Sequence, residues 1–269
     1  MVLSHAAQGL VAVSSREVVK FVHQTGRLVS AVVRPALWLL VFAAGFQNVF
    51  GVSIIPPYET YIRYEVYVVP GLLGMVLLFN GMQSSLSMVY DREMGVMRLL
   101  LTAPLPRWYL LLCKLIAGTL LSVLQAYAFL LLCALFRVDL PWMGWLRALP
   151  ALLASGMMLG AVGLLLSVYI RQLENFAGTM NFVIFPMFFI SSALYPLWKV
   201  QESGADVVYQ LARLNPFTHA VELIRFALYG QFHPAAGGVV AGSFLVFFVL
   251  AVLGYDPQRG LVGRVQRPA

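Results

Sequence analysis

"VYVVPGLLGMVLLFNGMQSSLSMV", residues 66–89, contains no charged side chain and is longer than the roughly 20 apolar residues that a helix needs to cross a bilayer. The rest of the chain has the same character. Of its 269 residues 61% are hydrophobic and 11% are charged, against roughly 25% charged in soluble domains. Its mean hydropathy is +0.83. The composition therefore predicts an integral membrane protein rather than one or two soluble domains.

Five further apolar runs are long enough, and free enough of charge, to be spanning helices. Together with the quoted stretch they lie at residues 35–52, 66–89, 109–136, 146–169, 176–197 and 236–254. The first run carries Gln47 and Asn48, and the last is short and flanked by glycine, so either could instead be re-entrant. We expect a single all-α domain over residues 1–269, a polytopic membrane protein with six transmembrane helices.

The N-terminal segment, residues 9–30, has the pattern of an interfacial amphipathic helix. Valines and Phe21 recur on one helical face, whereas Arg16 and Lys20 share the other. Such a helix lies along the membrane surface with its apolar face in lipid. A cleaved signal peptide is the alternative, but the long apolar run begins only after Arg34 and no small-residue cleavage site follows it.

The basic residues predict the orientation, because short loops rich in Lys and Arg stay in the cytoplasm. If the N-terminus is inside, most of the 18 basic residues fall in cytoplasmic segments, among them Arg16, Arg34, Arg92 and Lys114. We therefore expect a multi-pass protein of the cell (inner) membrane with both termini cytoplasmic. The formal net charge of +7 then indicates contact with membrane lipids. It does not indicate nucleic acid, because no basic stripe interleaves with exposed aromatic residues.

A charged segment joins the second and third expected spans. Apolar side chains recur there at three- and four-residue steps, with charged residues on the flanks, which predicts a short amphipathic helix over 91–104. Asp91 and Glu93 suit the positive end of a helix dipole, and Pro104 and Pro106 end the helix. Such a helix can bury one face in lipid or offer its polar end to a soluble partner. A solvated turn that merely links two spans is the third interpretation.

The sequence contains no motif for nucleotide binding or catalysis. The phosphate-binding loop G-x-x-x-x-G-K-[ST] is absent. Ser155 lacks the glycine two residues earlier that a nucleophile elbow needs. His219 and Glu222 have a metal-ligand spacing, but no second close ligand accompanies them, and a hydrogen-bonded histidine is the simpler interpretation. We therefore predict no catalytic, cofactor-binding or metal-binding residues, and no cofactor bound by this chain.

The interiors of the expected spans hold no carboxylate, which weakens the prediction of a gradient-driven carrier. Four polar residues form a stripe on the second span and are the candidates for a transport pathway: Asn80, Gln83, Ser84 and Ser87. Hydrogen bonding to neighbouring helices is the alternative, since such contacts are common between helices in membranes.

The long segment between the fifth and sixth expected spans predicts an outer re-entrant hairpin. Asn215 and Pro216 are typical of the N-cap and first position of a helix, and Gly230 is typical of its end. That helix would span about 21 Å, less than the roughly 30 Å hydrocarbon core, so we expect it to enter the outer leaflet and turn back. Glu222 and Arg225 stand one turn apart and can pair, which lowers the cost of partial burial.

Three stretches carry a family resemblance: "YDREMGVMRLLLTAPLPRWYLL" at 90–111, "FFISSALYPL" at 188–197 and "RLNPFTHAVELIRFALYG" at 213–230. In order and spacing they resemble the membrane subunit of ABC-2 type exporters, a family of permeases for polysaccharides, lipid-linked glycans, nodulation factors and hydrophobic drugs. The resemblance covers nearly the whole chain. It implies a permease that pairs with a second copy of itself, or with a similar chain, and with two ABC ATPase subunits that bind ATP and Mg²⁺.

On this resemblance, residues 91–104 are similar to a coupling helix that contacts the ATPase, and the turn at 171–175 is a second, weaker contact. The segment 199–230 is similar to the family's paired re-entrant helices. We assign the dimer interface, as a hypothesis, to the first and fifth spans. The residues assigned to ATPase coupling are Asp91, Arg92, Glu93, Gly95, Met97, Arg98, Leu101, Pro104, Arg171 and Glu174.

The leading prediction is therefore the transmembrane permease subunit of an ATP-binding cassette exporter, a transport subunit and not an enzyme. A gradient-driven carrier or channel and a structural membrane subunit are the alternatives. The short segment 51–65 leaves no outer domain that could bind a sugar or a protein, so the sequence does not predict the substrate. Aromatic runs such as "FPMFF" at 185–189 could line a path but are more typical of a lipid-facing surface.

Overall fold

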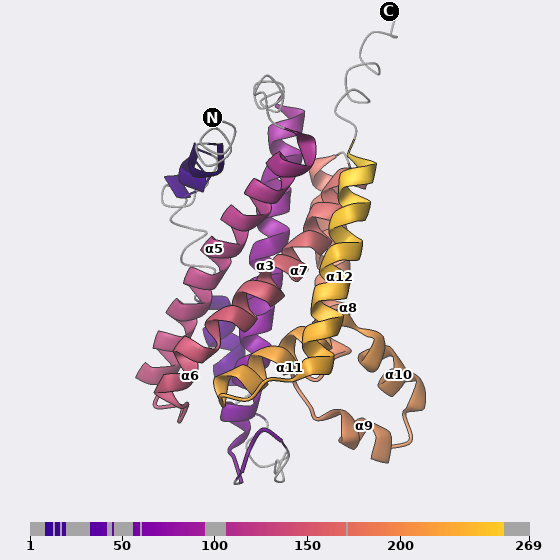
Figure 1. Cartoon of the computed structure of the whole chain (residues 1–269). Coiled ribbons are helices and arrows are strands. Elements are labelled where there is room, and N and C mark those ends of the chain that lie inside the picture. Colours follow the sequence, from indigo (N-terminus) through magenta and orange to yellow (C-terminus); the bar gives the residue numbers. More distant parts are fainter. Residues whose placement is uncertain are drawn as a thin grey trace, which may run out of the picture.

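The computed structural model describes residues 9–12, 14–16, 18–19, 33–41, 45, 56–59, 61–94, 106–170 and 172–255. Residues 9–19 and 33–41 are helical where they are described. The elements with defined bounds, labelled as in Figure 1, are α3 (Tyr64–Glu93), α5 (Arg107–Leu135), α6 (Trp142–Arg147), α7 (Leu149–Tyr169), α8 (Leu173–Phe189), α9 (Leu197–Glu202), α10 (Asp206–Leu214), α11 (Pro216–Leu228) and α12 (Pro234–Gly254).

Among the described residues, four helices form a bundle and are long and apolar enough to cross a membrane: α3, α5, α7 and α12. Short helices lie at one end of this bundle, with α11 running across it and α9 and α10 beyond it (Figure 1). We call this end the Tyr64 end, after the first residue of α3, and the opposite end the Glu93 end, after the last. The residues described before position 20 lie toward the Glu93 end (Figure 1).

The bounds of these four helices lie close to four of the predicted spans, namely 66–89, 109–136, 146–169 and 236–254. The first predicted span, 35–52, is described only in part and is helical there. The fifth, 176–197, corresponds to α8, which begins earlier and ends earlier than predicted. Among the described residues there are thus four candidate spans rather than the predicted six.

Helix α3 is the centre of the bundle. In its most apolar 18-residue window 94% of residues are buried, against 17% in α12. Glycines let α7 approach α3 closely, since a Cβ added at Gly81 would lie 2.9 Å from the Cα of Gly160. Small residues at such crossings favour packing between helices in lipid, where the hydrophobic effect contributes little. Most of α3 is therefore enclosed by other helices, although Gln83, Ser84 and Ser87 are only half-buried, while α12 contributes to the outer apolar surface.

Helix α8 ends before the predicted span does because distant side chains bond the carbonyl groups at its end. The Asn215 Nδ2 donates to the carbonyl oxygens of Met187 at 2.7 Å and Ile190 at 2.6 Å. Just beyond the helix, the Tyr67 hydroxyl donates to the Ser192 carbonyl oxygen at 2.9 Å. A helix can end in apolar surroundings only when its last carbonyls find such donors. Hydropathy shows none of this, because the donors lie far away in the sequence.

Helix α11 has the caps that the sequence predicts. The Asn215 side chain accepts a hydrogen bond from the Phe217 backbone N–H at 3.0 Å, and Pro216 is the first helical residue. The chain leaves the helix through Gly230, whose φ of 72° lies in the left-handed region that glycine favours. The rest of the predicted hairpin, 199–230, is made of the two short helices α9 and α10.

The predicted helix over 91–104 begins differently from expectation. Asp91, Arg92 and Glu93 form the last turn of α3, with Met94 as its C-cap, and do not start a new helix. No glycine or proline stands between Val89 and Glu93 to end α3 earlier, and Arg92 suits the negative end of the helix dipole. The following predicted coupling residues lie outside the described residues: Gly95, Met97, Arg98, Leu101, Pro104 and Arg171.

Candidate functional site

The two segments predicted as ATPase contacts meet at the Glu93 end. The Glu93 carboxylate accepts a hydrogen bond from the backbone N–H of Leu173, the first residue of α8, at 3.0 Å. This bond satisfies one of the unpaired N–H groups of a helix start and places a negative charge at the positive end of its dipole. Glu174, in the same turn, is exposed. The last turn of α3 and the first turn of α8 thus form one continuous surface.

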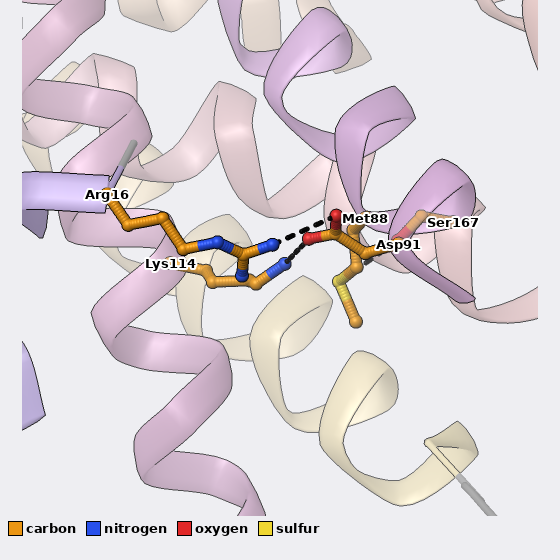
Figure 2. A network of polar contacts seen from close by, with 5 residues as sticks. All are labelled: Arg16, Met88, Asp91, Lys114 and Ser167. Atoms are coloured by element: carbon orange, nitrogen blue, oxygen red, sulfur yellow. Dashed lines mark hydrogen bonds and ion pairs between the residues drawn. The ribbon is translucent and has the colours of Figure 1, made fainter. Parts of the chain in front are cut away.

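Asp91 is buried, in contrast to its neighbour Glu93, and its side chain is only 3% exposed. Its carboxylate accepts from the Lys114 Nζ on α5 at 3.0 Å and from the Arg16 Nη2 at 3.3 Å, as Figure 2 shows. Met88 and Ser167 lie beside it and contact each other (Figure 2). A buried carboxylate needs such partners, because removing an unpaired charge from water is costly. Asp91 therefore joins α3, α5 and the N-terminal segment, and does not face outward as the coupling assignment expected.

Two more basic side chains of the same end of the bundle lie near Tyr255, just after α12. Burial raises the pKa of Tyr255, and the nearby guanidinium groups of Arg92 and Arg107 oppose that rise. Arg107 itself is exposed at the start of α5. Basic side chains at one end of an apolar bundle suit anionic lipid headgroups or an acidic partner surface.

The predicted pathway residues on α3 divide between two indentations of the bundle. Asn80 and Gln83 line one of them, a shallow indentation, together with Arg34. Ser84 lines the other, which lies between α3, α5 and α7. Ser87 is half-buried. The stripe is therefore not one continuous surface, and its first two residues share an indentation with a cation.

Arg34 is a candidate that the sequence did not indicate at this position. The charge count assigned it to the cytoplasmic segment, but its guanidinium carbon lies 4.3 Å from the centre of the Phe79 ring. At about 1.5 Å per residue, Phe79 is roughly 21 Å from either end of α3. A cation thus lies beside the middle of a membrane-length helix. The depth of a residue just before an apolar run depends on tertiary packing, so no local pattern could have revealed it.

At the Tyr64 end, Arg225 is buried and holds α11 against α3. It pairs with Glu222, donates from Nη2 to the Ser192 carbonyl oxygen at 2.9 Å, and lies 4.2 Å from the centre of the Tyr67 ring. Burial alone would lower the pKa of Arg225, but the Glu222 carboxylate and nearby tyrosines raise it overall. The predicted pairing of Glu222 and Arg225 is therefore present. It stabilises the contact between α11, α3 and the chain that follows α8.

The described part of the chain contains no cluster of side chains suited to metal or thiol chemistry. No group of three or more His, Cys, Asp or Glu residues there could hold a metal ion. The His219 Nε2 lies 2.9 Å from the Arg213 carbonyl oxygen, a hydrogen bond that accounts for this ring. Cys113 and Cys133 are buried free thiols.

Comparisons with known proteins agree on one family. The family model described as ABC-2 type transporter matches residues 8–229. A protein of Cyanophora paradoxa assigned as a transport permease, ycf38, is 27% identical over 202 residues, which are 74% of this chain and 67% of that protein. The daunorubicin resistance ABC transporter permease protein DrrB1 of Streptomyces coeruleorubidus is 25% identical over 222 residues, 80% of this chain and 73% of the relative. YbhR of Escherichia coli K12, assigned as a multidrug ABC transporter permease, is 26% identical over 171 residues, 62% and 45% of the two chains.

Proposed function

Because the chain belongs to the ABC-2 type transporter family and is a transmembrane permease subunit of an ABC exporter, we propose that its Glu93 end docks on separate ATPase subunits. The observation that carries this proposal is the hydrogen bond between Glu93 and the Leu173 N–H, which joins the last turn of α3 to the first turn of α8. Both segments then offer a single docking surface. ATP and Mg²⁺ are bound by the partner and not by this chain.

The docking proposal fixes the orientation. The Glu93 end lies in the cytoplasm, the Tyr64 end faces outward, and both termini are cytoplasmic in the cell (inner) membrane. The basic side chains around Asp91 support this orientation, since positive residues concentrate on the cytoplasmic side. The short helices α9, α10 and α11 then lie at the outer leaflet, as the re-entrant prediction requires.

A second copy of the chain is proposed to pack on the open side of α8. Asn181 is exposed halfway along this apolar helix, and Phe182 beside it is 78% exposed. An amide facing lipid is costly, because nothing in lipid bonds it. Gly178 has open space where a side chain would lie, which permits close approach of another helix. Trp38 of the first membrane segment packs on Phe188 of α8, so the first and fifth predicted spans lie side by side in one chain, which supports assigning both to one interface.

Coupling on this proposal is mechanical. Closure of the ATPase on ATP displaces the docked Glu93 end, and the ion pairs of Asp91 carry that displacement to α5 and the N-terminal segment. The two membrane halves then change their mutual tilt and open the pathway outward. Such a transition does work only if the nucleotide-bound partner binds the two membrane states with different affinity.

The test is to purify the tagged chain from its native membrane in mild detergent, identify what accompanies it, and measure ATP hydrolysis and export. An ABC ATPase in roughly equal amount is expected, and the Glu93→Lys variant should lose it or lose transport. The Glu93→Gln variant keeps an acceptor for the Leu173 N–H but removes the negative charge, so it shows whether docking needs the hydrogen bond or the charge. Glu202→Lys makes the same charge change at the Tyr64 end and serves as the control, since Glu202 is exposed there.

Three results would contradict the proposal. A chain that purifies without any ATPase, yet moves solute in vesicles under an ion gradient, is a carrier or channel. A chain that moves nothing, with or without a partner, is a structural subunit. Equal loss of transport in Glu93→Lys and Glu202→Lys would remove the docking role of the Glu93 end while leaving the family assignment intact.

A further inference from the structure

The indentation that contains Arg34 lies between the first membrane segment and α3. It is lined by the apolar residues Pro35, Met75 and Val76 and by the polar residues Asn80 and Gln83. It lies beside the middle of α3, roughly 20 Å from either end at about 1.5 Å per residue. An ionisable side chain at that depth in a membrane bundle marks a functional site more often than a structural one.

The guanidinium of Arg34 lacks a carboxylate partner among the described residues. The ion pairs found there are Arg16 with Asp91, Lys114 with Asp91, Arg63 with Glu65 and Arg225 with Glu222. Arg34 instead stacks on the Phe79 ring at 4.3 Å. A ring face stabilises a cation less than desolvation destabilises it, so this contact does not compensate the charge.

The amide of Asn80 adds donors to the same indentation. Asn80 is only 6% exposed, and its Nδ2 has no hydrogen-bond partner in the described part of the chain. A guanidinium presents five N–H donors and no acceptor, and an amide nitrogen presents two more donors. The indentation thus combines a cation with an unpaired amide donor, which together are the complement of an anionic oxygen group.

We propose that Arg34 and Asn80, with Gln83 beside them, bind the anionic phosphate or carboxylate group of an amphipathic molecule. The apolar part of that molecule lies along Met75 and Val76 and continues into the bilayer. This inference rests on the proposed function, because it names the substrate class of the permease as anionic amphiphiles. The same chemistry also fits a resident anionic phospholipid, and the experiment separates the two sources.

The first measurement is binding to the purified full-length chain in a neutral detergent. Native mass spectrometry compares dioleoyl phosphatidate with dioleoylglycerol, which has the same acyl chains and no anionic group. Wild type should retain phosphatidate preferentially. Losing one charge-assisted hydrogen-bonding partner should weaken that binding by about tenfold or more in Arg34→Gln. Arg34→Lys keeps the charge and loses the planar donor fork, so its phosphatidate binding should be intermediate between that of wild type and that of Arg34→Gln.

Two further variants keep the test independent of misfolding. Asn80→Asp has the same shape as wild type but gives Arg34 an internal carboxylate, so the chain should fold and phosphatidate binding should fall as in Arg34→Gln. Arg137→Gln removes one exposed positive charge just after α5, away from the Glu93 end, and should leave binding within about twofold of wild type. Undiminished binding in both Arg34→Gln and Asn80→Asp, or an equal loss in Arg137→Gln, overturns the proposal.

Measuring ATP hydrolysis by the complex of the chain with its ATPase distinguishes a transported molecule from a resident lipid. Phosphatidate that stimulates ATP hydrolysis in wild type and not in Arg34→Gln behaves as a transported molecule. Phosphatidate that binds through Arg34 without changing ATP hydrolysis behaves as a resident lipid. The binding measurement needs no ATPase, so a failure of this site and a failure of the docking proposal give different results.

Discussion

Replacing Asp91 by asparagine should weaken the Glu93 end of the bundle by about 3 kcal/mol. The Asp91 side chain is 3% exposed and that of Lys114 is 12% exposed, so the substitution leaves an almost buried ammonium group without a counter-ion. Breaking a buried pair on one side costs about 3–5 kcal/mol, and the low end applies because the Lys114 stem can carry its ammonium group to the surface. Arg16 is 33% exposed, so its ion pair with Asp91 should stabilise this end as a surface pair does, by less than about 1 kcal/mol.

A buried thiol next to Lys114 allows this to be measured locally. Cys113 is the preceding residue of α5 and is inaccessible in the folded chain, so a maleimide labels it only when that end opens. In a Cys133→Ala background, labelling of Cys113 should accelerate about a hundredfold in Asp91→Asn, since about 1.4 kcal/mol corresponds to tenfold. Arg16→Gln should accelerate it less than about fivefold. The measurement is the rate of maleimide incorporation in detergent, well below the unfolding temperature.

The double variant Asp91→Asn/Lys114→Gln decides whether the reasoning is right. It removes both buried charges and should restore most of the lost protection, because neither partner is then left unpaired. If the effects of the two single variants simply add, Asp91 and Lys114 do not interact energetically. If Arg16→Gln opens the site as much as Asp91→Asn, the N-terminal segment and not the buried pair holds this end together.

Two further predictions concern the packing of the other helices. Gly81→Ala should lower the unfolding free energy by about 1–3 kcal/mol, because its Cβ would lie 2.9 Å from backbone of α7, whereas Gly242→Ala on α12 has open space and should be neutral or slightly stabilising. Thermal unfolding in detergent measures both, and equal shifts in Tm would show that the crossing is not tight. Asn215→Ala should cost about 1–3 kcal/mol through the lost cap and the lost donors to the end of α8, and Asn215→Asp, which keeps the cap acceptor only, should not recover it. An Asn215→Asp variant as stable as wild type would assign the whole effect to the cap.

The long helices could be predicted from the sequence because their apolar runs are uninterrupted and much longer than a soluble helix needs. The caps of α11 could also be predicted from the sequence, since Asn215 and Pro216 act on their immediate neighbours. The end of α8 could not be predicted, because it depends on Tyr67 and Asn215, which are distant in the sequence. Hydropathy continues past Phe189 and contains no sign of these donors.

The candidate functional site, too, could be predicted from the sequence only in part. Charge and amphipathic spacing predicted a functional segment around Glu93, but could not show which of its side chains face inward. Asp91 and Glu93 are two residues apart, and only packing makes one a buried ion-pair partner and the other a cap for α8. Arg34 depends on tertiary structure altogether, because the sequence specifies only that it precedes an apolar run.

Helix α8 is bonded to α3 near both of its ends, through the Glu93 carboxylate at one and the Tyr67 hydroxyl just beyond the other. These two bonds resist sliding of the helices along each other, so α3 and α8 should shift together rather than separately. The compliance that a gate requires must then lie at other seams, such as that of α12, which packs on α7 and α11 and has only 17% of its most apolar window buried.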